Sequence, residues 1–130
     1  MTTNTHLEHL VLKIKSESQS LNFYSDFLSL MGYQKDFESE NYINYTNPNL
    51  AIGLYFETGF GEASENVSGL GHLAWQTHDF SLINRLCEVL KKYELEHETL
   101  GENRNHHNQE FFTVCFYCPS GNRLELIYKK

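Results

Sequence analysis

Residues 9–14, His-Leu-Val-Leu-Lys-Ile, return in similar form as residues 72–77, His-Leu-Ala-Trp-Gln-Thr. The offset is 72 − 9 = 63 residues, close to half of the 130-residue chain. In the first stretch Leu10, Leu12 and Ile14 alternate with His9, Val11 and Lys13, which predicts a strand with two different faces. A repeat of this length indicates that one structural unit occurs twice.

The same succession of elements follows each of these stretches. In the first half we expect a strand, a helix and three further strands at residues 8–14, 16–31, 33–38, 41–46 and 50–57. In the second half we expect the same elements at residues 70–77, 79–92, 95–100, 111–118 and 123–129. Asp79 or Ser81 is the candidate N-cap of the second helix. The sequence therefore predicts an α+β fold of two tandem βαβββ modules, about 7–57 and 70–129, within a single domain spanning residues 1–130.

Two segments interrupt the repeat. Residues 58–69 contain three glycines and several polar residues, which indicates a linker between the modules. Residues 101–109, Gly-Glu-Asn-Arg-Asn-His-His-Asn-Gln, show no apolar periodicity. We predict that they form a polar loop, either a lid over a site or a surface loop.

The composition excludes several classes of partner. The net charge of −7 argues against nucleic acid and against an anionic membrane. No apolar stretch approaches the roughly 20 residues that a membrane-spanning helix needs, and the N-terminus has no signal-peptide pattern. Nine Phe, eight Tyr and one Trp suit either a dense core or a cavity for a flat apolar ligand.

The cysteines indicate a reducing compartment. Cys87, Cys115 and Cys118 cannot all pair within the chain, which fits the cytoplasm. Cys115 and Cys118 have the spacing of a redox or zinc pair, but residues three apart on a strand point to opposite faces. We therefore predict buried thiols at these positions.

Three residue types suited to binding a metal share one side of their predicted strands. His9, His72 and Glu125 all lie opposite the apolar positions of their own strands. If that side is concave, the three side chains point into one cavity, where two histidines and a carboxylate form a metal triad with open positions. Taken singly, each residue has an alternative to metal binding. Each histidine is then a hydrogen-bonded core residue, and Glu125 is a solvent-facing strand residue.

The first module lacks the carboxylate that the second one carries. Aligning residues 52–55 with residues 124–127 places Gly53 opposite Glu125. We expect an open coordination position there. The alternative is a fourth ligand from Tyr55 or Glu57, which share the face of Gly53. Among the other histidines, His6, His78 and His97 are expected on the surface. His106 and His107 lie in the polar loop, where one of them is a candidate for proton transfer or for lining an entrance.

Three motifs resemble the vicinal oxygen chelate superfamily, which includes glyoxalase I, bleomycin-resistance proteins, extradiol dioxygenases and fosfomycin-modifying thiol transferases. The motifs are His9-Leu-Val-Leu followed by Asn22-Phe-Tyr, Gly69-Leu-Gly-His-Leu-Ala-Trp, and Pro119-Ser-Gly-Asn-Arg-Leu-Glu-Leu. The resemblance covers about residues 7–128. Cys118 and Ser120 stand where the family commonly has aspartates in the last motif.

The resemblance implies paired βαβββ modules that form a half-open curved sheet around a central cavity, commonly in a homodimer. It implies His9, His72 and Glu125 as ligands of a divalent metal, which the ligand types allow to be Fe, Mn, Zn, Ni or Co. Glu125, Tyr55 and His107 are the candidate catalytic residues. Gly53 at the fourth ligand position argues against a straightforward glyoxalase I activity.

Two functional hypotheses follow. The first is a metal-dependent lyase, isomerase or dioxygenase whose metal chelates neighbouring oxygens of a small substrate as a Lewis acid or redox centre. Because the histidines must be neutral, its activity should fall at acidic pH. The second is a metal-free protein similar to the bleomycin-resistance members, which sequesters an aromatic or cationic ligand.

Overall fold

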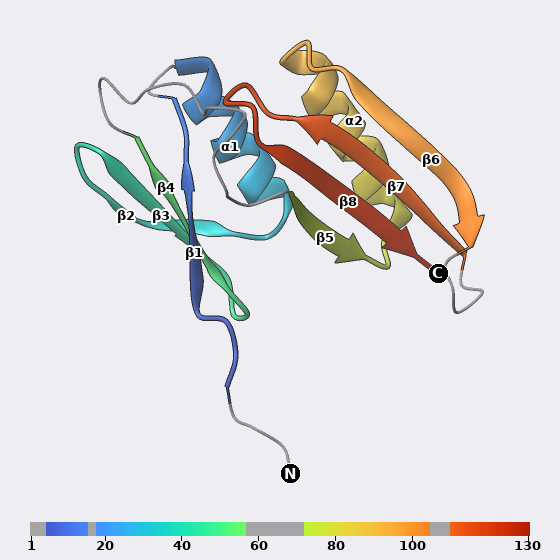
Figure 1. The fold of residues 1–130 in the computed structure, drawn as a ribbon, viewed down its shortest axis with the longest axis horizontal. Coiled ribbons are helices and arrows are strands. Elements are labelled where there is room, and N and C mark those ends of the chain that lie inside the picture. Colours follow the sequence, from blue (N-terminus) through green and yellow to red (C-terminus); the bar gives the residue numbers. More distant parts are fainter. Residues whose placement is uncertain (1–4, 16–17, 57–71, 105–109) are drawn as a thin grey trace, which may run out of the picture. The chain divides into compact units, whose positions relative to one another are not determined.

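The computed structural model describes residues 5–15, 18–56, 72–104 and 110–130 of the chain. The predicted linker 58–69 and the candidate residues Glu57, His106 and His107 lie outside the described residues. The chain divides into two compact units, residues 1–61 (unit 1) and residues 62–130 (unit 2). Figure 1 shows a four-stranded sheet and one helix in each unit.

Unit 1 contains the first predicted module. Its elements are β1 (His9–Lys13), α1 (Ser18–Leu30), β2 (Gln34–Glu38), β3 (Tyr42–Thr46) and β4 (Ala51–Tyr55). The strand order in the sheet is β1-β4-β3-β2. β1 runs parallel to β4, and the other neighbouring strands are antiparallel.

Unit 2 repeats this topology. Its elements are β5 (Leu73–Thr77), α2 (Phe80–Lys92), β6 (His97–Arg104), β7 (Glu110–Tyr117) and β8 (Arg123–Lys129). The strand order is β5-β8-β7-β6, again with a parallel first pair. The prediction of an α+β fold with two tandem βαβββ modules is confirmed.

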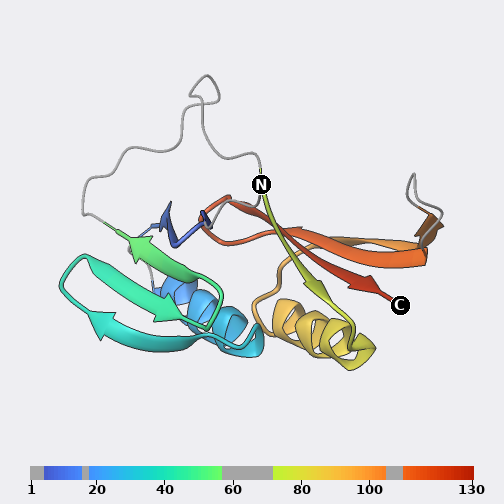
Figure 2. The same ribbon diagram turned by 90° about the horizontal axis from the view of Figure 1, so that it is seen from below.

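Each helix covers one face of the sheet in its own unit (Figure 2). The apolar stripe of α1 buries Phe23, Tyr24, Phe27 and Leu28, and that of α2 buries Ile83, Leu86 and Leu90. Asp79 is the N-cap of α2, as predicted, because its side chain accepts a hydrogen bond from the backbone N–H of Ser81. Gly32 follows α1 with φ of +90°, a conformation that a residue with a Cβ adopts at a cost.

The alternation expected from the sequence sets the two faces of both sheets. Leu12 of β1, Ile14 directly after it, and Leu124 and Leu126 of β8 are buried, whereas His9, Val11 and Lys13 are exposed. The helix-covered faces therefore hold the core. His9, His72 and Glu125 lie on the opposite faces, which we call the open faces.

Strand β6 differs from the prediction for residues 101–109. Its backbone continues to Arg104, where Asn103 pairs with Phe111 and Arg104 with Glu110 beyond an irregularity that follows Leu100. Strand pairing uses only backbone N–H and C=O groups, so a strand can continue through a polar sequence. The predicted loop therefore begins later than expected, and residues 105–109 lie outside the described residues.

Two further sequence predictions concern the cysteines and membrane-spanning helices. Cys115 and Cys118 are buried, and no disulfide joins any of the three cysteines, all of which are described. No helix in the described part of the chain is long and apolar enough to cross a membrane.

Candidate metal site

The two candidate histidines occupy equivalent positions in the two sheets. In unit 1, Val11 pairs with Gly53, and in unit 2, Ala74 pairs with Glu125. His9 precedes Val11 by two residues and His72 precedes Ala74 by two. Side chains two residues apart on a strand share a face. His9 therefore lies on the open face of its sheet, on the strand next to Gly53, and His72 has the equivalent position immediately before the strand next to Glu125.

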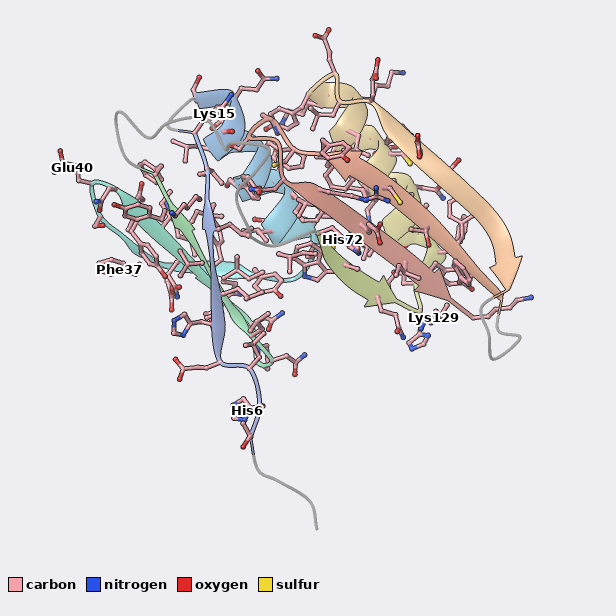
Figure 3. The ribbon with its side chains drawn as sticks, viewed as in Figure 1. His6, Lys15, Phe37, Glu40, His72 and Lys129 are labelled. Carbon is pink, nitrogen blue, oxygen red and sulfur yellow. The ribbon has the colours of Figure 1, made fainter. Side chains whose placement is uncertain are left out.

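His72 and Glu125 approach each other in unit 2. His72 lies immediately before β5 (Figure 3), and its Nε2 is 3.7 Å from Oε2 of Glu125. The histidine side chain is 50% exposed and the glutamate side chain 13% exposed. Glu125 is thus a shielded carboxylate with one oxygen turned toward an accessible imidazole.

The other oxygen of Glu125 has protein partners. Nε and Nη2 of Arg123 donate to Oε1 at 3.2 and 3.0 Å, and Sγ of Cys115 donates to the same oxygen at 3.5 Å. These contacts follow from geometry, since Arg123 is two residues before Glu125 on β8 and Cys115 is its direct partner on β7. They fix the carboxylate and leave Oε2 on the side of His72.

The two side chains that contact Oε1 of Glu125, Arg123 and Cys115, both have raised pKa values. The hydrogen bond to Glu125 is the main cause that raises the pKa of Arg123. Burial raises the pKa of the Cys115 thiol, and the negative charge of Glu125 raises it further. Cys115 is therefore a neutral S–H donor at neutral pH rather than a thiolate ligand.

The His72–Glu125 pair fits one edge of a metal site. Two ligand atoms at about 2.0–2.2 Å from a tetrahedral ion lie about 3.4 Å apart, close to the 3.7 Å found here. Hydrogen bonds that fix the second oxygen of a ligand carboxylate are typical of metal sites. Among the described residues there is no group of three or more His, Cys, Asp or Glu side chains that could hold a metal. The predicted third ligand, His9, belongs to unit 1.

His9 is exposed on the first strand of unit 1. Its Nδ1 lies 3.2 Å from Oε1 of Glu8, and the two side chains are 55% and 85% exposed. A contact this exposed contributes little to stability. Its effect on a metal site would be to orient the imidazole through Nδ1, as carboxylates do behind many ligand histidines.

The position equivalent to Glu125 is filled by a neighbouring side chain. A Cβ atom added to Gly53 would collide with the hydroxyl of Tyr42 and would lie 2.5 Å from its Cζ and 2.7 Å from its Cε2. The Tyr42 hydroxyl donates to Oδ1 of Asn44 at 3.1 Å, and Nδ2 of Asn44 donates to Asp36 at 2.8 Å. The ring of Tyr42 thus crosses the open face of β4 where module two carries its carboxylate.

Solved structures share this fold over nearly the whole chain. A glyoxylase/bleomycin resistance protein/dioxygenase domain from Frankia sp. EAN1pec matches with a TM-score of 0.75 at 17% identity, covering 98% of this chain and 100% of that one. A glyoxalase/bleomycin resistance protein from Albidiferax ferrireducens T118 matches with a TM-score of 0.74 at 14% identity, covering 94% and 98%. The chain has the glyoxalase fold.

Lactoylglutathione lyase from Agrobacterium tumefaciens has the glyoxalase fold as well, with a TM-score of 0.64, 15% identity and coverage of 98% of this chain and 96% of that one. No protein-family model and no curated protein matches the sequence. The resemblance predicted from three short motifs is therefore confirmed at the level of the glyoxalase fold.

The remaining candidates are Tyr55 and the other histidines. Tyr55, the last residue of β4, is half-buried and pairs with Lys13 and Tyr42. His6, His78 and His97 are exposed, as predicted. His78 is occupied at the end of its strand, where Nδ1 lies 2.8 Å from the carbonyl oxygen of Lys129. His107 lies outside the described residues.

Sequence reasoning missed Arg123 and Cys115, which contact Glu125, and Tyr42, which lies against Gly53. Spacing alone could have indicated Arg123, since residues two apart on a strand share a face. Cys115 and Tyr42 could not be found this way, because their contacts depend on the register between strands.

Proposed function

We propose that this protein is a divalent-metal-dependent enzyme of the vicinal oxygen chelate type, with a small oxygen-chelating substrate and with His9, His72 and Glu125 as metal ligands. The observation that carries the proposal is the 3.7 Å approach of His72 Nε2 to Glu125 Oε2 on the open face of unit 2. The equivalent placement of His9 in unit 1 supports it. The glyoxalase fold of the solved structures is compatible with it.

A bound divalent ion would supply Lewis acidity, or redox chemistry if it is iron or manganese. The protein's own contribution is positional. Arg123 holds Oε1 of Glu125, so the carboxylate presents Oε2, and the low exposure of Glu125 limits competition from water. Tyr55 and His107 remain our candidates for moving protons at the substrate.

The second candidate function is the metal-free sequestration of an aromatic or cationic ligand. Arg123 favours it, because its guanidinium already neutralises Glu125 with two hydrogen bonds to one oxygen. A carboxylate paired in this way needs no cation to stay buried. Under either function we propose a homodimer in the cytoplasm, the latter supported by three cysteines without a disulfide.

Metal content decides between the two functions. Untagged protein would be incubated with Fe, Mn, Zn, Ni or Co, desalted and measured by elemental analysis, alongside His9→Ala, His72→Ala and Glu125→Ala variants. We expect about one equivalent of a metal in the parent and a loss of at least tenfold in affinity in each variant. The matched control is His78→Ala. His78 is an exposed histidine directly after β5, and its Nδ1 forms a hydrogen bond with the carbonyl oxygen of Lys129.

Thermal unfolding of each variant would show that it folds. A parent that takes up none of the five metals would overturn the enzyme proposal and favour sequestration. Equal metal loss in His78→Ala and in the three ligand variants would show that the uptake is nonspecific.

A further inference from the structure

The open face of unit 1 carries a hydroxyl group at the position where unit 2 carries a ligand carboxylate. Gly53 is the register equivalent of Glu125, and the absence of a side chain there lets the ring of Tyr42 cross β4. Tyr42 itself is half-buried, and its hydroxyl lies over Gly53 on the open face.

The direction of the Tyr42 hydroxyl proton is fixed by its neighbours. The Asp36 carboxylate only accepts hydrogen bonds, so the amide NH₂ of Asn44 must face it, at 2.8 Å. Oδ1 of Asn44 then faces Tyr42, which must donate to it, at 3.1 Å. The tyrosine proton is thereby committed to Asn44, and the hydroxyl oxygen offers its lone pairs to any group that approaches.

An irregularity in β2 supports this arrangement. The register shifts between Lys35 and Phe37, so Phe37 pairs with Asn44 while the side chain of Asp36 reaches the same asparagine. Such a bulge sets two residues against one on the partner strand. Phe37 is 57% exposed, and its ring centroid lies 6.4 Å from that of Tyr42. The ring of Tyr42 therefore lies beside an exposed apolar side chain.

We propose that Tyr42 is a substrate-binding residue whose oxygen accepts a hydrogen bond from an N–H or O–H group of the bound small molecule, with Asn44 and Asp36 as positioning residues. This inference rests on the proposed metal site. The substrate class is then an oxygen chelator that also carries a hydrogen-bond donor next to an apolar group. In this proposal Tyr42 contacts the substrate and not the metal.

The test uses cobalt(II) and two hydroxamic acids as probes. Acetohydroxamic acid chelates through two oxygens and keeps an N–H group, whereas N-methylacetohydroxamic acid chelates in the same way without it. Both would be titrated into cobalt-loaded parent and Tyr42→Phe protein, with the visible cobalt spectrum as the readout. The control variant is Tyr93→Phe, which removes a hydroxyl at the C-cap of α2 in unit 2.

We expect Tyr42→Phe to bind one equivalent of cobalt as the parent does, since phenylalanine keeps the ring over Gly53. Its affinity for acetohydroxamic acid should fall about threefold to tenfold, as expected for one neutral hydrogen bond. Its affinity for the N-methyl compound should be unchanged. Asn44→Ala should reduce the discrimination between the two probes, because the Tyr42 hydroxyl is then able to rotate.

The outcomes separate the two proposals. Loss of cobalt in Tyr42→Phe would make Tyr42 a metal ligand and overturn the inference alone. If Tyr42→Phe binds both hydroxamic acids as the parent does, or binds both equally more weakly, the role of Tyr42 is overturned and the metal site is left intact. A parent that binds neither cobalt nor any of the other four metals would overturn the proposed function and, with it, this role for Tyr42.

Discussion

Gly53 and Glu125 occupy the same register position in the two units. Gly53 pairs with Val11 of β1, and Glu125 pairs with Ala74 of β5, which follows Val11 by 63 residues. The two modules therefore share strand register as well as element order. They differ in what this register position carries. In unit 2 it carries the carboxylate of Glu125, whereas in unit 1 the ring of Tyr42 covers Gly53.

Gly53→Ala should destabilise the protein. The added methyl group would push the ring of Tyr42 away from β4 and weaken its hydrogen bond to Asn44. We expect the free energy of unfolding to fall by about 1–2 kcal/mol, measured by urea denaturation, as for other overpacked positions.

The matched control is the same substitution in a Tyr42→Ala background. There the methyl group meets no ring, so it should cost little, and the double-mutant cycle should give a coupling energy of about 1 kcal/mol. Additive effects would contradict the proposed contact between Gly53 and Tyr42.

Arg123→Met should destabilise unit 2 by removing both guanidinium donors from Oε1 of Glu125. Because the arginine side chain is 39% exposed, we expect only a modest loss in the free energy of unfolding. Arg123→Lys should recover only part of it, since an ammonium group cannot donate from two nitrogens to one oxygen. Full recovery by lysine would show that charge alone matters.

The sequence predicts the elements well because each depends on local pattern. Alternation located the strands, and Asp79 marks the start of α2 through a contact with Ser81, two residues away. The end of β6 was predicted too early, because pairing with β7 is made by the backbone and carries no side-chain signature.

The site was only partly predictable, for a related reason. Parity along single strands placed His9, His72 and Glu125 on the open faces. The Tyr42–Asn44–Asp36 chain depends on the β2–β3 register and on the irregularity in β2, neither of which the sequence reveals. Gly53 was recognised as a missing ligand, but the side chain that crosses it comes from another strand.

Asp79 should make the stability of α2 depend on pH. Hydrogen bonds from the Ser81 hydroxyl and backbone N–H lower the pKa of this carboxyl group below its ordinary value. A lowered pKa in the folded state stabilises the protein above the unfolded pKa of about 3.9, and this contribution is lost as the pH falls through the folded value. Asp79→Ala should therefore lower the melting temperature by a few degrees at pH 7, and the difference should shrink below pH 4.

Asp79→Asn is the control for this titration. Asparagine is also a good N-cap but does not ionise, so this variant should keep most of the stability at pH 7. Its loss on acidification should be smaller than that of the parent. A parent and an Asp79→Asn variant with the same acid dependence would contradict the assignment.

Cys115 should react slowly with iodoacetamide in metal-free protein. Burial raises the pKa of its thiol, and the charge of Glu125 raises it further. Since only the thiolate reacts, the pH midpoint for alkylation, followed by mass spectrometry, should lie above that of a cysteine peptide. Glu125→Gln should move this midpoint to lower pH, because it removes the negative charge but not the burial. Cys87, whose pKa is raised by burial alone, supplies an internal control, and its midpoint should be the same in both proteins. A Cys115 midpoint that stays fixed in Glu125→Gln would show that the thiol does not sense the carboxylate.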